Sequence, residues 1–166
     1  MTPESEREFR VYVEANRAAL LRMAFLTCGD WHHAEDAVQT ALVKLFGAWD
    51  RTRRETVDAY TRRIVANVLV DQTRRTWFRR ERSYAFPPDQ REAASPGDDQ
   101  AEAAAILARL PLKQRATIVL RFWEDQSVEQ TARILRCSTG TVKSNTARGL
   151  KTLREHYETL NPAGSK

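Results

Sequence analysis

Hydrophobic residues recur at helical spacing through most of this chain, and the alternation typical of half-buried strands is absent. In the first half the pattern predicts three helices, over roughly residues 5–27, 31–49 and 57–75. The Cys28-Gly29-Asp30 sequence ends the first of them, because glycine favours the left-handed conformation that closes a helix. The pattern therefore predicts an all-α fold.

Residues 127–148, SVEQTARILRCSTGTVKSNTAR, predict two short helices joined by a tight turn. Ser127 and Gln130 have the spacing of a capping box, and Ser138 is a suitable N-cap for the second helix. The buried side of that helix is expected to carry Val142, Thr146, Leu150 and Leu153. Two helices in this arrangement predict a helix-turn-helix that reads DNA.

The outward face of the second helix supports this prediction. A turn of about 100° per residue places four residues furthest from the core, with a fifth at the helix start. Between Arg136 and Arg154 there are five basic residues and no acid. Basic helix faces are often merely solvated, but the capped helix and turn before this one favour entry into a major groove. The predicted DNA-binding residues are Thr141, Ser144, Ala147, Arg148 and Lys151.

Charge divides the chain into three parts. Residues 1–80 carry 14 basic and 11 acidic groups, residues 81–104 carry 2 and 6, and residues 105–166 carry 11 and 5. The middle part contains prolines and a glycine and lacks a helical apolar period, which is typical of a flexible or extended linker. We therefore expect two small helical modules, 1–80 and 105–166, joined by an acidic linker, 81–104.

Composition excludes several classes of protein. With 166 residues, 42% hydrophobic and 30% charged, the chain resembles a globular protein, and no apolar run approaches membrane-spanning length. The polar N-terminus MTPESEREFR lacks the apolar region of a signal peptide, so a cytoplasmic location is expected. Cys28 and Cys137 lack partners at metal-binding spacing, so we expect no disulfide, no metal site and no cofactor.

The outward side of the second predicted helix combines polar acceptors with exposed apolar groups. A patch of this kind often marks a site where another protein binds. Alternatively, Val43 and Phe46 cover the linker or a neighbouring helix. The predicted docking residues are Asp36, Gln39, Val43 and Phe46.

The third predicted helix carries Arg63, Asn67, Val70 and Arg74 along one exposed stripe. Residues 51–80 contain nine arginines and three acids, interleaved with Tyr60, Trp77 and Phe78. Cations suit phosphates and aromatic rings suit unstacked bases, so this helix is a candidate surface for single-stranded nucleic acid. The aromatic residues could equally belong to the core.

Three segments in order resemble signatures of the bacterial extracytoplasmic-function sigma factors, the smallest sigma-70-type initiation factors, and among them the actinobacterial SigE-type subset. The segments are AEDAVQTALVKLFGAW (34–49), AYTRRIVANVLVDQTRR (59–75) and LARLPLKQRATIVLRFWEDQSVEQTARILRCSTGTVKS (107–144). The resemblance implies a sigma-2-like bundle and a sigma-4-like helix-turn-helix. It also implies a non-enzymatic subunit that directs RNA polymerase to promoters.

The resemblance assigns a partner to each surface. Asp36 and Gln39 occupy the D-x-x-Q positions that contact the β′ clamp helices of core polymerase, and the second module would meet the β flap. Lys143, Ser144 and Arg148 align with residues that meet the minus-thirty-five element. An anti-sigma factor is a further implied partner. For the minus-ten element, the resemblance implies Arg63, Asn67, Arg74 and Arg75, and it places the loop that contains Arg53 and Arg54 where the family holds an extruded non-template base. Val70, on the exposed stripe, completes the residues predicted for this element.

The chain departs from the family pattern at Arg136, where glycine is usual in the turn, and at Thr131, where an aliphatic residue is usual. Asn145 and the pair Gly149-Leu150 replace frequent arginines. Two other classes of function fit the sequence less well. A stand-alone helix-turn-helix regulator would leave the Asp36 surface and the linker unexplained. An enzyme lacks support, because no phosphate loop, nucleophile elbow or HExxH motif is present.

Overall fold

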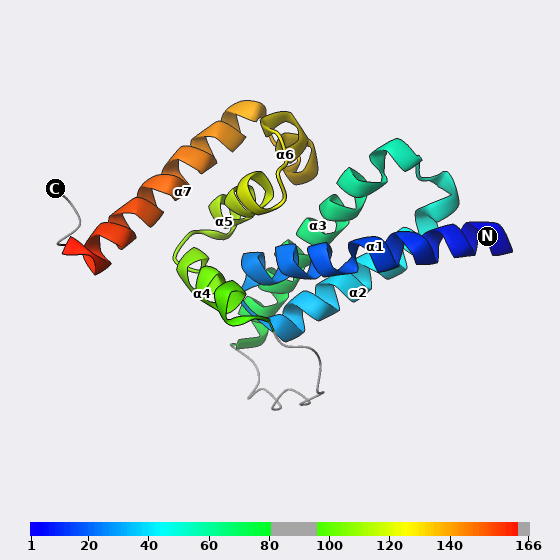
Figure 1. The fold of residues 1–166 in the computed structure, drawn as a ribbon, viewed down its shortest axis with the longest axis horizontal. Helices are drawn as coiled ribbons and strands as arrows, with labels where there is room; N and C mark the ends of the chain where they lie inside the picture. Colours follow the sequence, from blue (N-terminus) through cyan, green and yellow to red (C-terminus); the bar gives the residue numbers. More distant parts are fainter. Residues whose placement is uncertain (81–95, 163–166) are drawn as a thin grey trace.

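The computed structural model describes residues 1–80 and 96–162, and of residues 73–80 it describes only the helical backbone. Within these ranges every regular element is helical, which confirms the all-α prediction. The first half consists of three long helices (Figure 1). They are α1 (Pro3–Cys28), α2 (Trp31–Ala48) and α3 (Val57–Arg80), with the short 3-10 turns η1 (Trp49–Arg51) and η2 (Arg54–Thr56) between α2 and α3.

Local capping fixes where these helices begin and end. The Thr2 hydroxyl accepts a hydrogen bond from the Ser5 amide at 3.1 Å at the start of α1. Gly29 ends α1 with φ 74°, a left-handed conformation that glycine adopts without a steric penalty. The Asp30 carboxylate then accepts from the His33 amide at 3.0 Å and starts α2. The predicted boundary at residues 28–30 is therefore confirmed.

The second half contains four shorter elements and one long helix. The helices are α4 (Asp98–Leu107), α5 (Leu112–Ile118), α6 (Val128–Leu135) and α7 (Thr139–Leu160). A π-helical turn, η3 (Val119–Trp123), extends α5. α7 packs on α5 and α6, and its C-terminal end projects from the fold (Figure 1).

The prediction of a linker throughout 81–104 is wrong for its last part. Helix α4 begins at Asp98, and its buried Ala104 and Leu107 belong to the face that packs against α1. Alanine favours helices strongly, and Asp98 and Asp99 lie in the first turn, where negative charge is favourable. The small alanine side chains hid the helical period. Residues 81–95 lie outside the described residues.

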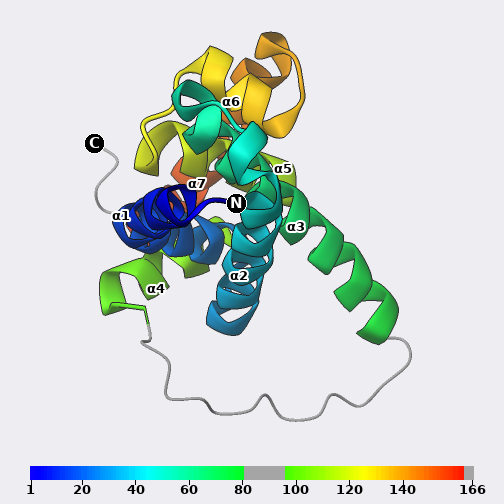
Figure 2. The same cartoon turned by 90° about the vertical axis from the view of Figure 1, so that its right-hand side faces the viewer.

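The two halves share one continuous hydrophobic core. The C-terminal half packs across α1 and α3, with α4 on α1 and α6 on α3, and Figure 2 shows α6 beside α3. Fully buried side chains from both halves contribute, each worth about 1.5–3 kcal/mol of transfer free energy. The largest include Met23, Leu45, Trp49, Leu69, Leu107, Ile118, Leu120 and Ile134. The two predicted modules are therefore packed together in this structure.

Candidate nucleic-acid interface

The predicted helix-turn-helix is formed by α6, a short turn and α7. The Gln130 amide donates to the Ser127 hydroxyl at 3.0 Å, and the Ser127 amide donates to the Gln130 side chain at 2.8 Å, so the capping box is complete. The Thr141 amide donates to the Ser138 hydroxyl at 3.1 Å and starts α7. Arg136 makes the turn in the left-handed conformation, with φ 55°. The predicted caps and turn are all confirmed.

All six candidate residues for the minus-thirty-five element lie on the exposed side of α7. Among the described residues, none forms an ion pair with Lys143, Arg148 or Lys151, so these cations face solvent unpaired. Unpaired arginine and lysine on one helix face can contact phosphates and guanine edges. The exposed residues are Thr141, Lys143, Ser144, Ala147, Arg148 and Lys151.

The buried side of α7 differs from the prediction at one position. Leu150 is 37% exposed, whereas Gly149 is buried against α5. A Cβ on Gly149 would lie 3.0 Å from the Cγ1 atom of Ile118 and 3.6 Å from the Cδ1 atom of Leu110. Glycine therefore lets α7 approach α5 closely, and this contact turns Leu150 toward solvent.

The candidate residues for the minus-ten element divide into two groups. On α3, Asn67 is exposed, whereas Arg63 and Val70 are half-buried. Arg74 and Arg75 continue the same helix, but their side chains lie outside the described residues.

The loop before α3 supplies the other two candidates. Arg53 is exposed, whereas the Arg54 guanidinium lies 4.0 Å from the centroid of the Trp49 ring and forms an ion pair with Glu8 at 2.5 Å. Beside this loop, α1 and Trp49 line an open surface groove of about 570 Å³. Burial raises the pKa of Tyr12, which lines this groove, to about 12, so Tyr12 stays protonated near neutral pH. Arg54 is therefore held against the groove rather than free.

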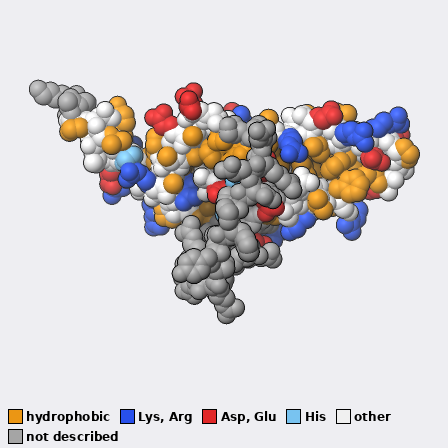
Figure 3. All heavy atoms as spheres, turned by 90° about the horizontal axis from the view of Figure 1, so that it is seen from below, with side chains coloured by type: hydrophobic (Ala, Val, Ile, Leu, Met, Phe, Trp, Pro, Cys, Tyr) orange, Lys and Arg blue, Asp and Glu red, His pale blue; other side chains and the backbone are white. Residues whose placement is uncertain are grey.

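The predicted docking surface on α2 is exposed. Asp36 and Gln39 face solvent, and Val43 and Phe46 are 62% and 46% exposed. The Phe46 ring packs edge-on against Phe9 of α1 at 5.2 Å between centroids, which leaves its other face open. Figure 3 shows hydrophobic side chains exposed on the side where α1 and α2 lie.

The Asp36 carboxylate is held in place by the neighbouring helix. The Gln72 amide on α3 donates to it at 2.7 Å. This contact links the docking surface on α2 to the helix that carries Asn67. Neither the periodicity nor the spacing of the sequence indicated it.

The two candidate DNA surfaces face each other across one cavity. This cavity of about 510 Å³ is lined by Asn67 and Val70 of α3 and by Arg136, Thr141 and Asn145 of the helix-turn-helix. The sequence predicts each of the two surfaces but not that they face each other, because no local sequence pattern determines how the two halves pack together.

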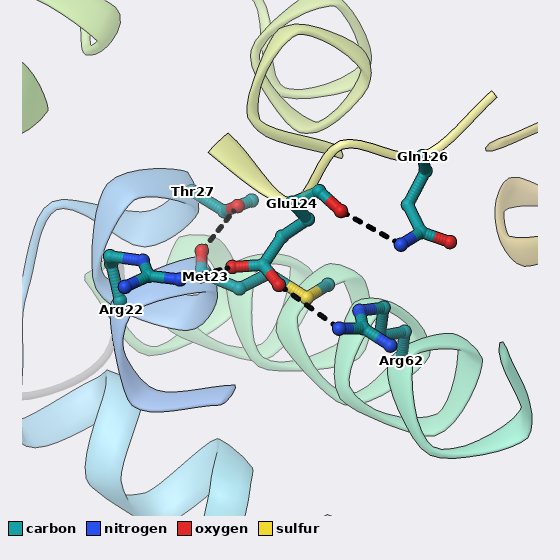
Figure 4. A network of polar contacts seen from close by, with 6 residues as sticks. All are labelled: Arg22, Met23, Thr27, Arg62, Glu124 and Gln126. Carbon is teal, nitrogen blue, oxygen red and sulfur yellow. Dashed lines mark hydrogen bonds and ion pairs between the residues drawn. The ribbon is translucent and has the colours of Figure 1, made fainter. Parts of the chain in front are cut away.

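An ion-pair cluster that the sequence did not reveal lies in the same interface. The Glu124 carboxylate, 3% exposed, is 3.4 Å from Nη2 of Arg22 on α1 and 3.1 Å from Nη2 of Arg62 on α3. Figure 4 shows both guanidinium groups approaching the carboxylate. The partners are separated by 102 and 62 residues along the chain, so spacing gave no indication of the cluster.

Other groups offer little chemistry. The described residues hold no group of three His, Cys, Asp or Glu side chains that could bind a metal ion. Cys28 and Cys137 are free thiols, and burial raises the pKa of Cys28 to about 11. No helix in the described ranges has both the length and the apolar character needed to cross a membrane.

Comparison with known proteins agrees with the two halves of the fold. The family model of sigma-70 region 2 matches residues 12–79, and that of sigma-70 region 4 matches residues 100–153. The chain is 41% identical over 158 residues to an RNA polymerase sigma-E factor of Streptomyces avermitilis, covering 91% of this chain and 86% of the relative. It is 34% identical to the ECF RNA polymerase sigma factor SigM of Mycobacterium tuberculosis, and the match covers 86% of this chain and 73% of that relative.

A solved structure has a similar fold. The sigma factor RpoE of Bartonella quintana, in complex with the anti-sigma factor NepR, superposes with a TM-score of 0.72 at 25% sequence identity. The superposition covers 90% of this chain and 96% of that one.

Proposed function

Because the chain belongs to the extracytoplasmic-function sigma factors of the sigma-70 family, we infer that its exposed helix faces serve promoter recognition by RNA polymerase. The protein is an RNA polymerase sigma factor that directs promoter-specific transcription initiation, with core polymerase and promoter DNA as its partners. The observation that carries this function is the ordered match to regions 2 and 4 along one chain. A stand-alone helix-turn-helix regulator would account only for the second region.

We assign the minus-thirty-five element to the exposed face of α7. Its small residues near the helix start allow close approach to the major groove, and Arg148 can pair with the O6 and N7 acceptors of guanine. The assigned residues are Thr141, Lys143, Ser144, Ala147, Arg148 and Lys151.

We assign the minus-ten element to α3 and the loop before it. The exposed Asn67 amide offers both a donor and an acceptor to a base edge, and the arginines offer charge to the strand. The loop carrying Arg53 and Arg54 lies beside a groove that an extruded base could enter. The assigned residues are Arg53, Arg54, Arg63, Asn67, Val70, Arg74 and Arg75.

We assign docking on core polymerase to the surface formed by Asp36, Gln39, Val43 and Phe46, facing the β′ clamp helices, and propose that the second half meets the β flap. The exposed apolar area of Val43 and Phe46 beside the Asp36 carboxylate, which Gln72 holds in place, supports this assignment. We further propose that the protein acts in the cytoplasm without catalytic chemistry of its own. We also propose an anti-sigma factor as a partner, because the structurally similar sigma factor RpoE was solved in complex with the anti-sigma factor NepR.

Run-off transcription tests the function directly. The purified chain is added to core polymerase and a genomic promoter library, and transcript starts are mapped with and without the protein. The expected result is a set of new starts that share two upstream elements. If core polymerase gains no new start sites, the assignment of a sigma-factor function to this chain is wrong.

A further inference from the structure

We propose that Arg22 and Arg62 form an anion-binding site that Glu124 fills while the two halves are packed together, and that a backbone phosphate of promoter DNA fills when they separate. The proposal rests on the sigma-factor function, because it requires DNA to reach α3. It adds Arg22 and Arg62 to the DNA-contacting surface and makes Glu124 the residue that blocks them.

Three elements bring this site together. Arg22 projects from α1, Arg62 from α3, and Glu124 follows the π-helical turn η3 (Figure 4). In that turn the Glu124 amide donates to the Val119 carbonyl at 3.1 Å, five residues back. This wider turn directs Glu124 into the interface while Phe122 and Trp123 remain exposed.

The buried Glu124 carboxylate lies within ion-pair distance of the two arginines. A carboxylate that is only 3% exposed is strongly destabilised unless cations and donors replace its water. Arg62 is itself largely buried, at 14% exposure, whereas Arg22 is 39% exposed. Removing the charge on Glu124 therefore weakens the contact between the halves.

The two guanidinium groups have more donors than Glu124 uses. Among the described side chains, the Nε atoms of Arg22 and Arg62 are buried and have no hydrogen-bond partner. Each arginine has five N–H donors in a planar fork that fits phosphate as well as carboxylate. A phosphate supplies more acceptor oxygens than one carboxylate, so it can use donors that Glu124 leaves free.

The position of the site suits a nucleic-acid strand. Arg62 is adjacent on α3 to Arg63, which lies about one turn before Asn67, so a phosphate on Arg62 would lie beside the strand assigned to that helix. Asn67 and Val70 line the cavity that also contains Thr141 and Asn145. DNA therefore reaches the site only when the helix-turn-helix moves away, which also removes Glu124.

The first experiment tests the block in the free protein. Glu124→Gln removes the charge with little change in shape, and Glu124→Lys adds repulsion from both arginines. Both variants should show a larger radius of gyration by small-angle scattering and faster alkylation of Cys137, which lines the cavity. Glu129→Gln, an exposed acid on α6, is the matched control and should change neither.

Circular dichroism establishes that the helices remain intact in each variant. If Glu124→Lys keeps its helical content, its radius of gyration and the wild-type alkylation rate, then Glu124 does not hold the halves together and the proposal is wrong. If Glu124→Lys loses helical content, Glu124→Gln and Arg22→Gln replace it in the test. A wild-type radius of gyration and alkylation rate for these two variants would equally show that the proposal is wrong.

The second experiment tests the phosphate site. Binding of single-stranded oligo(dT) to the full chain is measured against salt concentration. Glu124→Gln should bind more tightly than wild type. Adding Arg62→Gln to Glu124→Gln should then weaken binding and lower the slope of log affinity against log salt by about 0.7, the value for one phosphate on a single strand.

Arg17→Gln, an exposed arginine on α1, is the control in the same background and should leave the slope unchanged. If Arg62 has only a structural role, Arg62→Gln should open the molecule without changing the slope of log affinity against log salt, and that result overturns the proposal. Scattering and oligo(dT) binding need no polymerase. Absence of transcription with normal results here would contradict the sigma-factor function alone, whereas transcription with unchanged scattering would contradict this proposal alone.

Discussion

Arg136 occupies a backbone conformation that its side chain disfavours. Its φ of 55° and ψ of 49° are left-handed, and such a conformation costs a non-glycine residue about 1–2 kcal/mol. The amide of Cys137 nevertheless donates to the Ala132 carbonyl at 3.0 Å and closes α6. The turn geometry is therefore imposed by the packing of α6 and α7 rather than favoured by the residue.

We predict that Arg136→Gly stabilises the protein by about 1 kcal/mol, because glycine relieves this cost. Arg133→Gly is the matched control: the same exchange at an exposed position in the last turn of α6, where the backbone is right-handed, should destabilise by up to about 1 kcal/mol. Urea unfolding followed by circular dichroism measures both. A loss of stability for Arg136→Gly would show that the arginine side chain makes a favourable contact that outweighs the backbone.

Thr131 and Thr117 form a natural pair for a second prediction. Both are fully buried, but the Thr117 hydroxyl donates to the Lys113 carbonyl at 2.7 Å, whereas no described group bonds the Thr131 hydroxyl. Thr131→Val should therefore stabilise the protein by about 1 kcal/mol, since a buried unpaired hydroxyl carries a desolvation penalty. Thr117→Val should not stabilise it. Equal shifts in the unfolding midpoint would contradict this reasoning.

Helices with strong local signals could be predicted, and those that depend on contacts could not. Ser127, Gln130 and Ser138 specify the caps of α6 and α7 by spacing alone, and the structure has all of them. The sequence does not predict α4, because two of its three side chains in or against the core, Ala103, Ala104 and Leu107, are alanines, and it does not predict the π-helical turn η3. The prediction that Leu150 is buried is wrong, because Gly149, which has no hydrophobic side chain, makes the close contact with Ile118.

We predict different roles for Arg148 and Lys151, which share the exposed face of α7. Arg148 carries a planar fork that can read a guanine edge, so Arg148→Ala should cost about 1–3 kcal/mol and relax preference at one base pair. Lys151 lies nearly a turn further along and is a point charge suited to phosphate. Lys151→Ala should weaken all promoters equally and lower the salt slope by about one.

The two roles, base reading by Arg148 and phosphate contact by Lys151, are separated by measuring holoenzyme binding to single-base variants of the minus-thirty-five element at several salt concentrations. Arg154→Ala, further along α7, is the control and should have a smaller effect than either. If Arg148→Ala weakens every variant equally, Arg148 contacts the backbone and reads no base.

We predict that Asp36→Ala combined with Gln39→Ala weakens binding to core polymerase without unfolding the protein. Both side chains are exposed on α2, opposite the buried Val38 and Leu45, so their loss removes contacts to a partner rather than core packing. Competition against another sigma factor for core polymerase measures the effect. His32→Ala with His33→Ala changes two other exposed positions of the same helix, and an equal loss there would contradict the assignment.

The placement of the two halves lay beyond sequence reasoning, because the contacts that set it join distant residues. Glu124 meets Arg22 and Arg62, and Arg115 reaches the end of α1, 88 residues earlier. None of these pairs has a spacing or pattern that marks it. The sequence identifies which surfaces exist, whereas the long-range pairs decide which of them face each other.

Arg115 connects the ends of two helices, α4 and α1, across the molecule. Its guanidinium donates to the carbonyls of Leu107 at 3.1 Å, Leu110 at 2.9 Å and Thr27 at 2.6 Å. The Leu107 and Thr27 carbonyls lie at the C-terminal ends of α4 and α1, where a cation is favourable, and the Leu110 carbonyl lies in the turn that follows α4. Burial lowers the pKa of Arg115, but an arginine remains charged at any physiological pH.

We predict that Arg115→Lys destabilises the protein by about 1–3 kcal/mol, because one ammonium group cannot reach three carbonyls set for a planar fork. The charge is retained, so the effect isolates geometry from electrostatics. Arg109→Lys, the same exchange at an exposed position two residues after the end of α4, should shift stability by less than about 0.5 kcal/mol. Thermal unfolding compares the two. Because Thr27 belongs to the first half, Arg115→Lys should also speed alkylation of Cys137, and equal midpoints and rates for both variants would show that Arg115 does not join the halves.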